Sequence, residues 1–292
     1  MKKSSLFIFF LVSFLSNCQN LNKEIQKIVE GKKATVAVSV LDFGNNQSVD
    51  LNGDQKLPMQ SVFKFHIALA VLDYVDEGKL KLEQKIFIKK SDLLENTWSP
   101  IRNKYPDGNT ELPLSEIIRY TVAESDNNGC DLLLRLIGGT ETVQNFMNSK
   151  GIKNFSITAN EEEMHKDWKV QYRNFTTTNS MNELLKKFSE GKIVSEKSTA
   201  FLIKTMLGTT TGTNKIAGQL PKNTPVAHKT GSSGKNKDGL TGAENDAAII
   251  TLPNSKKYAL TVFVSDSMES ETENCKIISD ISRKVWEYLN QK

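Results

Sequence analysis

The sequence predicts an α/β fold of the α+β type, in which an antiparallel sheet is built from both chain ends with flanking helices, and an all-helical domain is inserted between those ends. Period-two apolar runs lie near both termini, and helical periodicity fills the middle of the chain. With 292 residues, 38% hydrophobic and 25% charged, the chain is long enough to bury a large core. This composition excludes a disordered or collagen-like protein.

Four short runs predict the strands, because β-branched and apolar residues alternate or cluster in them between turn residues. These runs are Thr35–Asp42, Ser48–Leu51, Asp246–Leu252 and Tyr258–Ser265. Gly44-Asn45-Asn46 predicts a hairpin turn between the first two, and Pro253-Asn254-Ser255 separates the last two. A helix over Cys275–Leu289 carries one apolar stripe that would cover the sheet. We therefore predict a sheet domain over residues 18–57 and 208–292.

Residues 58–207 are predicted to form the helical domain. Apolar residues recur there at helical spacing, and one helix ends at Gly138-Gly139. The predicted helices are Ile67–Tyr74, Leu114–Tyr120, Asp131–Ile137 and Met181–Phe188, with a short polar helix over Leu21–Glu30 before the first strand. A crevice between the two lobes is the natural place for a functional site.

The first 17 residues are predicted to be a signal peptide. Two lysines precede the apolar run Leu6–Leu15, which is too short to span a bilayer. The next residues, ending in Asn17-Cys18, resemble the lipobox of bacterial lipoproteins, although small residues are usual where Asn17 stands. Lipidation of Cys18 and plain cleavage nearby both stay open. In either case we expect an exported, periplasmic protein, free or tethered to a membrane, with a monomeric soluble body.

The net charge and the number of His and Cys residues limit the classes of function that the protein can have. Thirty-eight Lys and Arg against 34 Asp and Glu leave a net charge of +4 with no block of five like charges, so no nucleic-acid partner is indicated. Three His and three Cys make neither an HExxH pair nor a cysteine cluster, so we expect no metal and no cofactor. Any chemistry must come from other side chains.

Ser61-Val62-Phe63-Lys64 stands where a loop enters an apolar helix. Residues i and i+3 share a helix face, so the Ser61 hydroxyl and the Lys64 amine can come within hydrogen-bond reach. The amine could then accept the hydroxyl proton, and the helix N-terminus would offer a backbone N–H to an oxyanion. The same spacing also occurs at Ser189–Lys192 and at Ser232–Lys235. The motif is therefore weak when taken alone.

Two further triplets occur once each and strengthen this interpretation. Ser125-Asp126-Asn127 lies between helical stretches, and Lys229-Thr230-Gly231 follows an apolar pair and is typical of an edge strand. In this order and spacing, the three motifs resemble those of class A serine β-lactamases. His165 and Asp131 resemble the residues found in the extended-spectrum, cephalosporinase-rich branch of that class. The resemblance spans nearly all of the mature chain and implies a serine β-lactamase or penicillin-binding-protein-like fold.

This resemblance implies a catalytic role for three of the motif residues. The activity would be hydrolysis of the β-lactam amide of penicillins and cephalosporins through a serine acyl-enzyme, conferring antibiotic resistance. Ser61 would be the nucleophile, Lys64 would assist its activation, and Ser125 would pass a proton to the leaving nitrogen. The partners would be β-lactam antibiotics.

The segment Asn160–His165 resembles the omega loop of this family. Glu161 fits the general base that hydrolyses the acyl-enzyme, although three adjacent Glu would otherwise indicate a solvated acidic face. His165 stands where an Asn usually helps hold the deacylating water. Asp131 also replaces an Asn, and we expect it to anchor the omega loop by hydrogen bonds.

Substrate binding is implied for seven residues, His165 among them. Asn127 would bind the acylamide side chain, and Lys229 with Thr230 would hold the substrate carboxylate. The backbone N–H groups of Ser61 and Ser232 would form the oxyanion hole.

For the remaining two binding residues the sequence leaves an alternative open. Trp98 would line the pocket entrance, or else it is a core residue that closes a helix end. Lys215 would supply a second cation near the carboxylate, or else it is a solvated surface residue.

Other polar residues are predicted to be structural. His66 is expected to be a packed helix residue, and His228 is expected to point away from the pocket because it alternates with Lys229 on a strand. Cys130 and Cys275 are either free thiols, which we favour, or a disulfide.

Two other functions share some of these motifs. A D-Ala-D-Ala peptidase or penicillin-binding protein would have the Ser, Lys and Lys-Thr-Gly parts but no base of the Glu161 type, and would stay acylated. A non-hydrolytic β-lactam sensor would also stay acylated.

Overall fold

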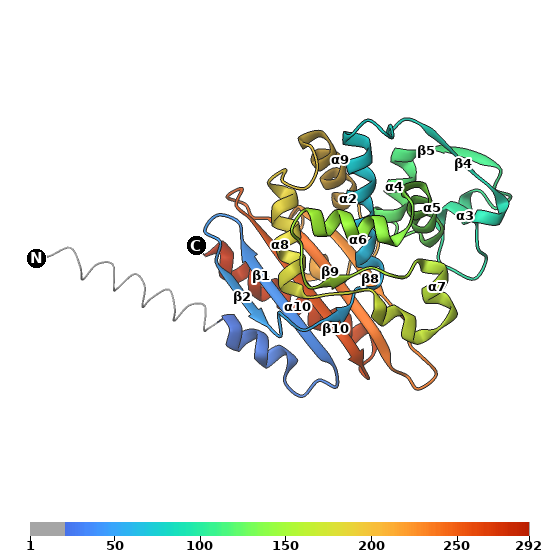
Figure 1. The fold of residues 1–292 in the computed structure, drawn as a ribbon. Helices are drawn as coiled ribbons and strands as arrows, with labels where there is room; N and C mark the ends of the chain where they lie inside the picture. The colour runs from blue at the N-terminus through green and yellow to red at the C-terminus, as the bar shows by residue number, and fades with distance from the viewer. Residues whose placement is uncertain (1–20, 292) are drawn as a thin grey trace, which may run out of the picture.

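One five-stranded antiparallel sheet joins the two ends of the chain in the computed structural model, which describes residues 21–291 (Figure 1). The strand order is β2-β1-β10-β9-β8. The strands are β1 (Thr35–Asp42), β2 (Ser48–Leu51), β8 (Val226–Ser232), β9 (Thr241–Thr251) and β10 (Lys257–Ser267). Because N-terminal β1 pairs with C-terminal β10 along its whole length, the predicted α+β fold is confirmed. The predicted signal peptide and Cys18 lie outside the described residues.

The two faces of the sheet are covered by different helices. Val36, Val38 and Val40 of β1 face a core shared with the helix over 21–29 and with α10 (Glu271–Asn290). Alternate residues point the other way, and α8 (Thr178–Ser189) packs on that face. Helix α10 begins one turn before the predicted start, because the Ser270 hydroxyl caps it by accepting the Glu273 N–H at 3.1 Å.

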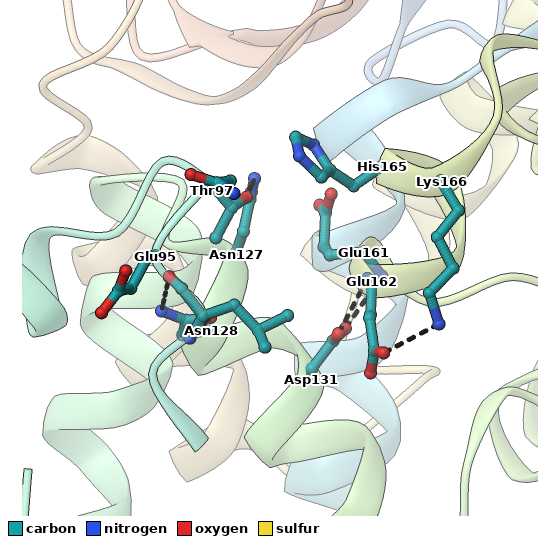
Figure 2. Close-up of a pocket in the computed structure, with 11 residues that line it drawn as sticks. Glu95, Thr97, Asn127, Asn128, Asp131, Glu161, Glu162, His165 and Lys166 are labelled. Carbon is teal, nitrogen blue, oxygen red and sulfur yellow. Dashed lines mark hydrogen bonds and ion pairs between the residues drawn. The ribbon is translucent and has the colours of Figure 1, made fainter. Parts of the chain in front are cut away.

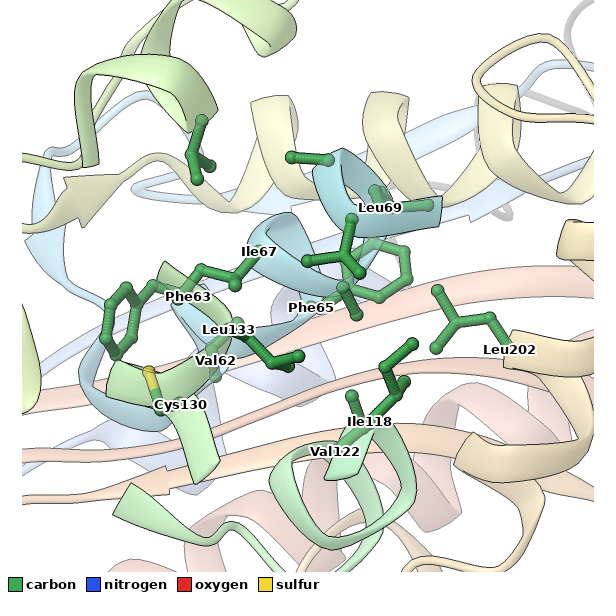
Figure 3. Packing of buried hydrophobic residues seen from close by; sticks show 14 of the residues in the cluster. Val62, Phe63, Phe65, Ile67, Leu69, Ile118, Val122, Cys130, Leu133 and Leu202 are labelled. Carbon is green, nitrogen blue, oxygen red and sulfur yellow. The ribbon is translucent and has the colours of Figure 1, made fainter. Parts of the chain in front are cut away.

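Helices make up most of the second lobe, which surrounds α2 (Phe63–Asp76). Every residue of α2 from Phe63 to Leu72 is buried, which explains why its sequence is apolar on all sides rather than along one stripe. Figure 3 shows Phe65 and Leu69 of α2 packed among side chains from neighbouring helices. The surrounding helices are α3 (Pro100–Lys104), α4 (Leu114–Ala123), α5 (Asn127–Ile137), α6 (Thr140–Ser149), α7 (Glu161–Lys166) and α9 (Glu196–Leu207).

This lobe also contains short strands that periodicity did not reveal. β4 (Lys85–Ile88) pairs with β5 (Thr110–Pro113), and β3 (Leu57–Pro58), β7 (Phe175–Thr176) and β6 (Phe155–Ser156) form a three-stranded sheet. Runs of two to four residues are too short to show alternation. The lobe is therefore mainly rather than wholly helical, and the domain boundaries at residues 57 and 207 stay predictions.

The residues predicted to be structural are buried. His66 is 1% exposed and its ring stacks on Phe155, and burial lowers its pKa to about 4. Cys130 and Cys275 are both free and buried, so the favoured interpretation is confirmed. Between residues 21 and 291, no helix has the length and apolar character needed to cross a membrane.

Candidate active site

Ser61 lies in a 3-10 turn, η1 (Gln60–Val62), that leads directly into α2. The preceding Gln60 adopts a left-handed conformation with φ of 47°, which turns the chain sharply before the serine. The Ser61 hydroxyl oxygen accepts a hydrogen bond from Lys64 Nζ at 2.8 Å. The contact expected from the i, i+3 spacing is therefore present.

The Lys64 amine joins all the predicted catalytic residues. It is fully buried and donates to the Ser125 carbonyl oxygen at 2.9 Å and to Asn127 Oδ1 at 2.5 Å. The Glu161 carboxylate lies 2.8 Å away. A hydroxyl, an amine and a carboxylate are thus in direct contact over a path along which a proton can move.

The Ser125-Asp126-Asn127 turn is fixed by its middle residue. Asp126 caps α5 and is fully buried, and it accepts the Gly129 N–H at 2.7 Å and the Ile101 N–H at 2.6 Å. Burial raises the pKa of this carboxyl group. With Asp126 fixed, Ser125 takes a φ of 60° and Asn127 presents its amide to Lys64.

The strand β8 brings a second buried lysine to the same place. Lys229 Nζ donates to Ser125 Oγ at 2.9 Å, and the side chain is fully buried. Burial, followed by the charges of Lys64 and Lys215, holds the pKa of Lys229 well below its ordinary value. His228 faces the other way and contacts Asp246 at 3.1 Å, so its predicted orientation is confirmed.

The glycine of the Lys-Thr-Gly triplet is required by close packing. A Cβ at Gly231 would lie 2.7 Å from the Met59 carbonyl oxygen and 3.1 Å from the Ser61 nitrogen. Asn245 of β9 reinforces this contact, because its Nδ2 donates to the Pro58 carbonyl at 2.8 Å. Only a residue without a side chain lets β8 approach the serine turn this closely.

Glu161 is the first residue of α7 and is positioned by Asp131. The Glu161 N–H donates to Asp131 Oδ1 at 2.9 Å, and the Glu162 N–H donates to Oδ2 at 3.0 Å (Figure 2). The Asn160 side chain completes the cap by accepting the Glu163 N–H at 2.8 Å. The predicted anchoring by Asp131 is confirmed, and burial raises the pKa of Asp131 to about 6.

Two adjoining cavities, of about 180 and 170 Å³, are lined in common by Thr97, Asn127, Glu161 and His165. Figure 2 shows the His165 ring beside the Glu161 carboxylate. A polar cavity of this size can hold water molecules with several hydrogen-bond partners. His165 therefore lies where it could share a water with Glu161, and this role stays a prediction.

The structure excludes one of the two alternatives left open for each of Trp98 and Lys215. Trp98 is 57% exposed, so the core alternative is wrong, and its Nε1 donates to the Glu124 carbonyl at 2.8 Å. Lys215 is 3% exposed, so it is not a solvated surface residue. Its amine lies 2.5 Å from Glu244 Oε1 and 3.1 Å from Ser232 Oγ. The pocket-wall and second-cation roles stay predictions.

Several side chains that no sequence motif marks also shape the site. Thr97 Oγ1 accepts the Asn127 amide at 2.6 Å, and Gln60 Nε2 donates to Gln171 Oε1 at 2.7 Å. Gly242 of β9 leaves room for the Gln171 amide, since a Cβ there would lie 2.5 Å from it. No motif marks these contacts, because each joins segments far apart in the sequence.

The whole chain is similar to known β-lactamases. A model of the β-lactamase enzyme family matches residues 20–289. The chain is 48% identical to β-lactamase VEB-1 of Pseudomonas aeruginosa over 98% of its own length and 96% of the relative. It is 42% identical to the extended-spectrum β-lactamase PER-1 of the same organism, covering 99% and 94% respectively. Among solved structures, TLA-3 extended-spectrum β-lactamase superposes with a TM-score of 0.92 at 52% identity, covering 94% of this chain and 99% of that one.

Proposed function

Since this chain belongs to the β-lactamase enzyme family and is a class A serine β-lactamase, we propose which of its side chains perform each step of β-lactam hydrolysis. The enzyme opens the β-lactam amide and so confers antibiotic resistance. The peptidase and sensor alternatives are not favoured, because the relatives are named β-lactamases. The proposal rests above all on the direct contacts of Lys64 with Ser61 and Glu161.

In the acylation step, Ser61 Oγ attacks the lactam carbonyl carbon. The Lys64 amine, which lies 2.8 Å from the hydroxyl, accepts the Ser61 proton. The backbone N–H groups of Ser61 and Ser232 stabilise the negative charge that develops on the carbonyl oxygen. When the carbon–nitrogen bond breaks, Ser125 gives the nitrogen its hydroxyl proton and takes one from Lys229, whose amine lies 2.9 Å away. Lys64 then releases the Ser61 proton to solvent and Lys229 regains a proton from solvent, so both amines return to their starting states.

In the deacylation step, Glu161 takes a proton from a water that attacks the ester carbonyl. The Ser61 oxygen then leaves and takes this proton back from Glu161 through Lys64, which contacts both residues, and the free enzyme is restored. Glu161 is 9% exposed and lines the two cavities, so its carboxylate can reach a water there while α7 holds the residue in place. We assign His165 the task of helping to orient this water.

Substrate binding follows from the polar groups around the serine. Lys229 carries the positive charge that holds the substrate carboxylate, and Thr230 adds its hydroxyl. Asn127 binds the acylamide side chain, and Trp98 walls the entrance next to Thr97. Because relatives such as PER-1 are named extended-spectrum β-lactamases, we propose penicillins and cephalosporins, including extended-spectrum cephalosporins, as substrates.

We also propose that the enzyme is exported, acts as a monomer and is lipidated at Cys18. The basic and apolar pattern before Cys18 supports export, and the lipobox resemblance supports the lipid anchor. Detergent partitioning of the full chain should place it in the detergent phase, and Cys18→Ser should release it. A mature N-terminus without acyl groups in mass spectrometry would remove the anchor but not export.

Ser61→Ala tests the assignment of the nucleophile. The purified enzyme should hydrolyse a penicillin and a cephalosporin continuously, whereas the variant should show neither turnover nor a covalent adduct. Circular dichroism provides the control, because deleting one partly exposed hydroxyl should leave the fold intact. Normal turnover by Ser61→Ala, with an adduct on another residue, would refute the assignment.

A further inference from the structure

A buried ion pair contacts Ser232, which lies on β8 just after the proposed carboxylate-binding residues Lys229 and Thr230. Lys215 and Glu244 approach to 2.5 Å, and their side chains are 4% and 5% exposed. Glu244 is on β9, opposite Ser232 of β8 in the strand register. Glu244 is therefore on a strand beside the active site, and Lys215, which precedes the 3-10 helix η4 (Ile216–Gln219), reaches it from outside the sheet.

Ser232 connects this pair to the pocket. Its residue is exposed, yet its hydroxyl accepts a hydrogen bond from Lys215 Nζ at 3.1 Å and donates to Glu244 Oε1 at 2.6 Å. The single hydroxyl proton is thus directed at Glu244 and not at the pocket. The orientation of this hydroxyl depends on the carboxylate behind it.

The Lys215 charge lies close enough to influence the site. It is one of the charges that lower the pKa of Lys229, the residue proposed to hold the substrate carboxylate. The remaining Lys215 contacts are neutral, to the carbonyl oxygens of Gly231 and Asn245, both at 3.1 Å. Among the described residues, Glu244 is the anion paired with this amine.

We propose that Glu244 is a positioning residue that determines specificity. Its carboxylate neutralises the Lys215 charge and turns the Ser232 hydroxyl away from the substrate. As a result, Lys229 is the single effective cation that holds the substrate carboxylate. This inference rests on the proposed function, because it assumes that the carboxylate binds beside Lys229. It predicts that Lys215 becomes a second cation for the substrate only when Glu244 loses its charge.

The first test removes both charges together. In Lys215→Gln/Glu244→Gln the net charge beside the active site is unchanged, so selectivity for a cephalosporin over its own methyl ester should stay close to that of the wild type. Selectivity is measured as the ratio of the two kcat/KM values. A roughly tenfold loss of this ratio, as expected for removal of a charge-assisted contact, would overturn the proposal.

The second test removes only the carboxylate. Glu244→Gln should raise the acid-to-ester ratio about fivefold or more, mainly through a lower KM for the acid, since a buried amine gains access to an anion. The kcat/KM of the acid should also fall more steeply with ionic strength. Glu111→Gln is the matched control, because it makes the same charge change on exposed β5 and should alter neither measurement.

The two tests separate this inference from the function on which it rests. If the wild type does not prefer the acid over the ester, the proposed carboxylate subsite fails. If the wild type prefers the acid but Glu244→Gln leaves or lowers that preference, only the role of Glu244 fails. The double variant decides the matter if the single variant does not fold.

Discussion

Asp131→Ala removes the acceptor for two backbone N–H groups at the start of α7, those of Glu161 and Glu162 at 2.9 and 3.0 Å. The Glu161 N–H group is buried, and a buried donor left without a partner lowers the free energy of unfolding by about 1 to 3 kcal/mol. Asp131→Asn keeps one acceptor oxygen and should avoid part of this cost. We expect the Ala variant to be less stable than the Asn variant by about 2 kcal/mol.

The same residue gives the stability a pH dependence with a definite sign. Burial raises the pKa of Asp131 from 3.8 to about 6, so the folded protein binds this proton more tightly than the unfolded chain does. The contribution of the protonated Asp131 side chain to the free energy of unfolding is fully present below about pH 4 and is lost as pH rises through 6. Two pKa units correspond to at most about 3 kcal/mol. Because an Asn side chain cannot titrate, Asp131→Asn should abolish this pH dependence of stability.

Urea unfolding of the wild type and both variants between pH 4 and pH 7 measures these effects. The wild-type free energy of unfolding, taken relative to that of Asp131→Asn, should fall as pH rises from 4 to 6. Subtracting the Asn variant removes the titration of other groups. A difference that does not change with pH, or an Ala variant as stable as the Asn variant, would refute the role given to this carboxyl group.

Three further substitutions probe the rest of the site. Lys229→Ala should lower kcat/KM for carboxylate-bearing substrates by about 10- to 100-fold, the worth of one charge-assisted hydrogen bond, and steady-state kinetics checks this. Gly231→Ala places a Cβ 2.7 Å from the Met59 carbonyl oxygen; it should cost about 1 to 3 kcal/mol in thermal unfolding and should reduce acylation. His165→Asn should preserve most of the turnover if His165 only helps orient the water used by Glu161; a loss as large as that from removing the base would contradict this role.

Local patterns predicted much of the fold. The strands β1 and β2 have the predicted bounds, because period two with β-branched residues is a signal contained within a single segment. Helix α5 instead begins at Asn127, four residues before the predicted start, since its cap is Asp126, a residue that the sequence marked only as part of a motif. The helix α6 was missed although Val143, Phe146 and Met147 are buried at helical spacing.

The site was predictable where its geometry is local or shared with a family. The Ser61 to Lys64 contact follows from helix spacing alone, whereas no pattern predicted the contact of Lys64 with Glu161, because it joins segments far apart in the sequence. The ion pair between Lys215 and Glu244 could not be predicted, because it depends on the pairing of β8 with β9 and on burial. Charges that neutralise each other in the fold look identical in the sequence to charges exposed to solvent.

The central claim is that Ser61 forms an ester that Glu161 hydrolyses through a water. Glu161→Gln keeps the length and shape of the side chain but removes the base, and intact-protein mass spectra taken seconds and minutes after mixing with a cephalosporin measure the outcome directly. We predict an acyl-enzyme that accumulates and persists, with deacylation slowed by at least about 10²- to 10⁴-fold. Unmodified protein together with normal hydrolysis would show that the base is another residue.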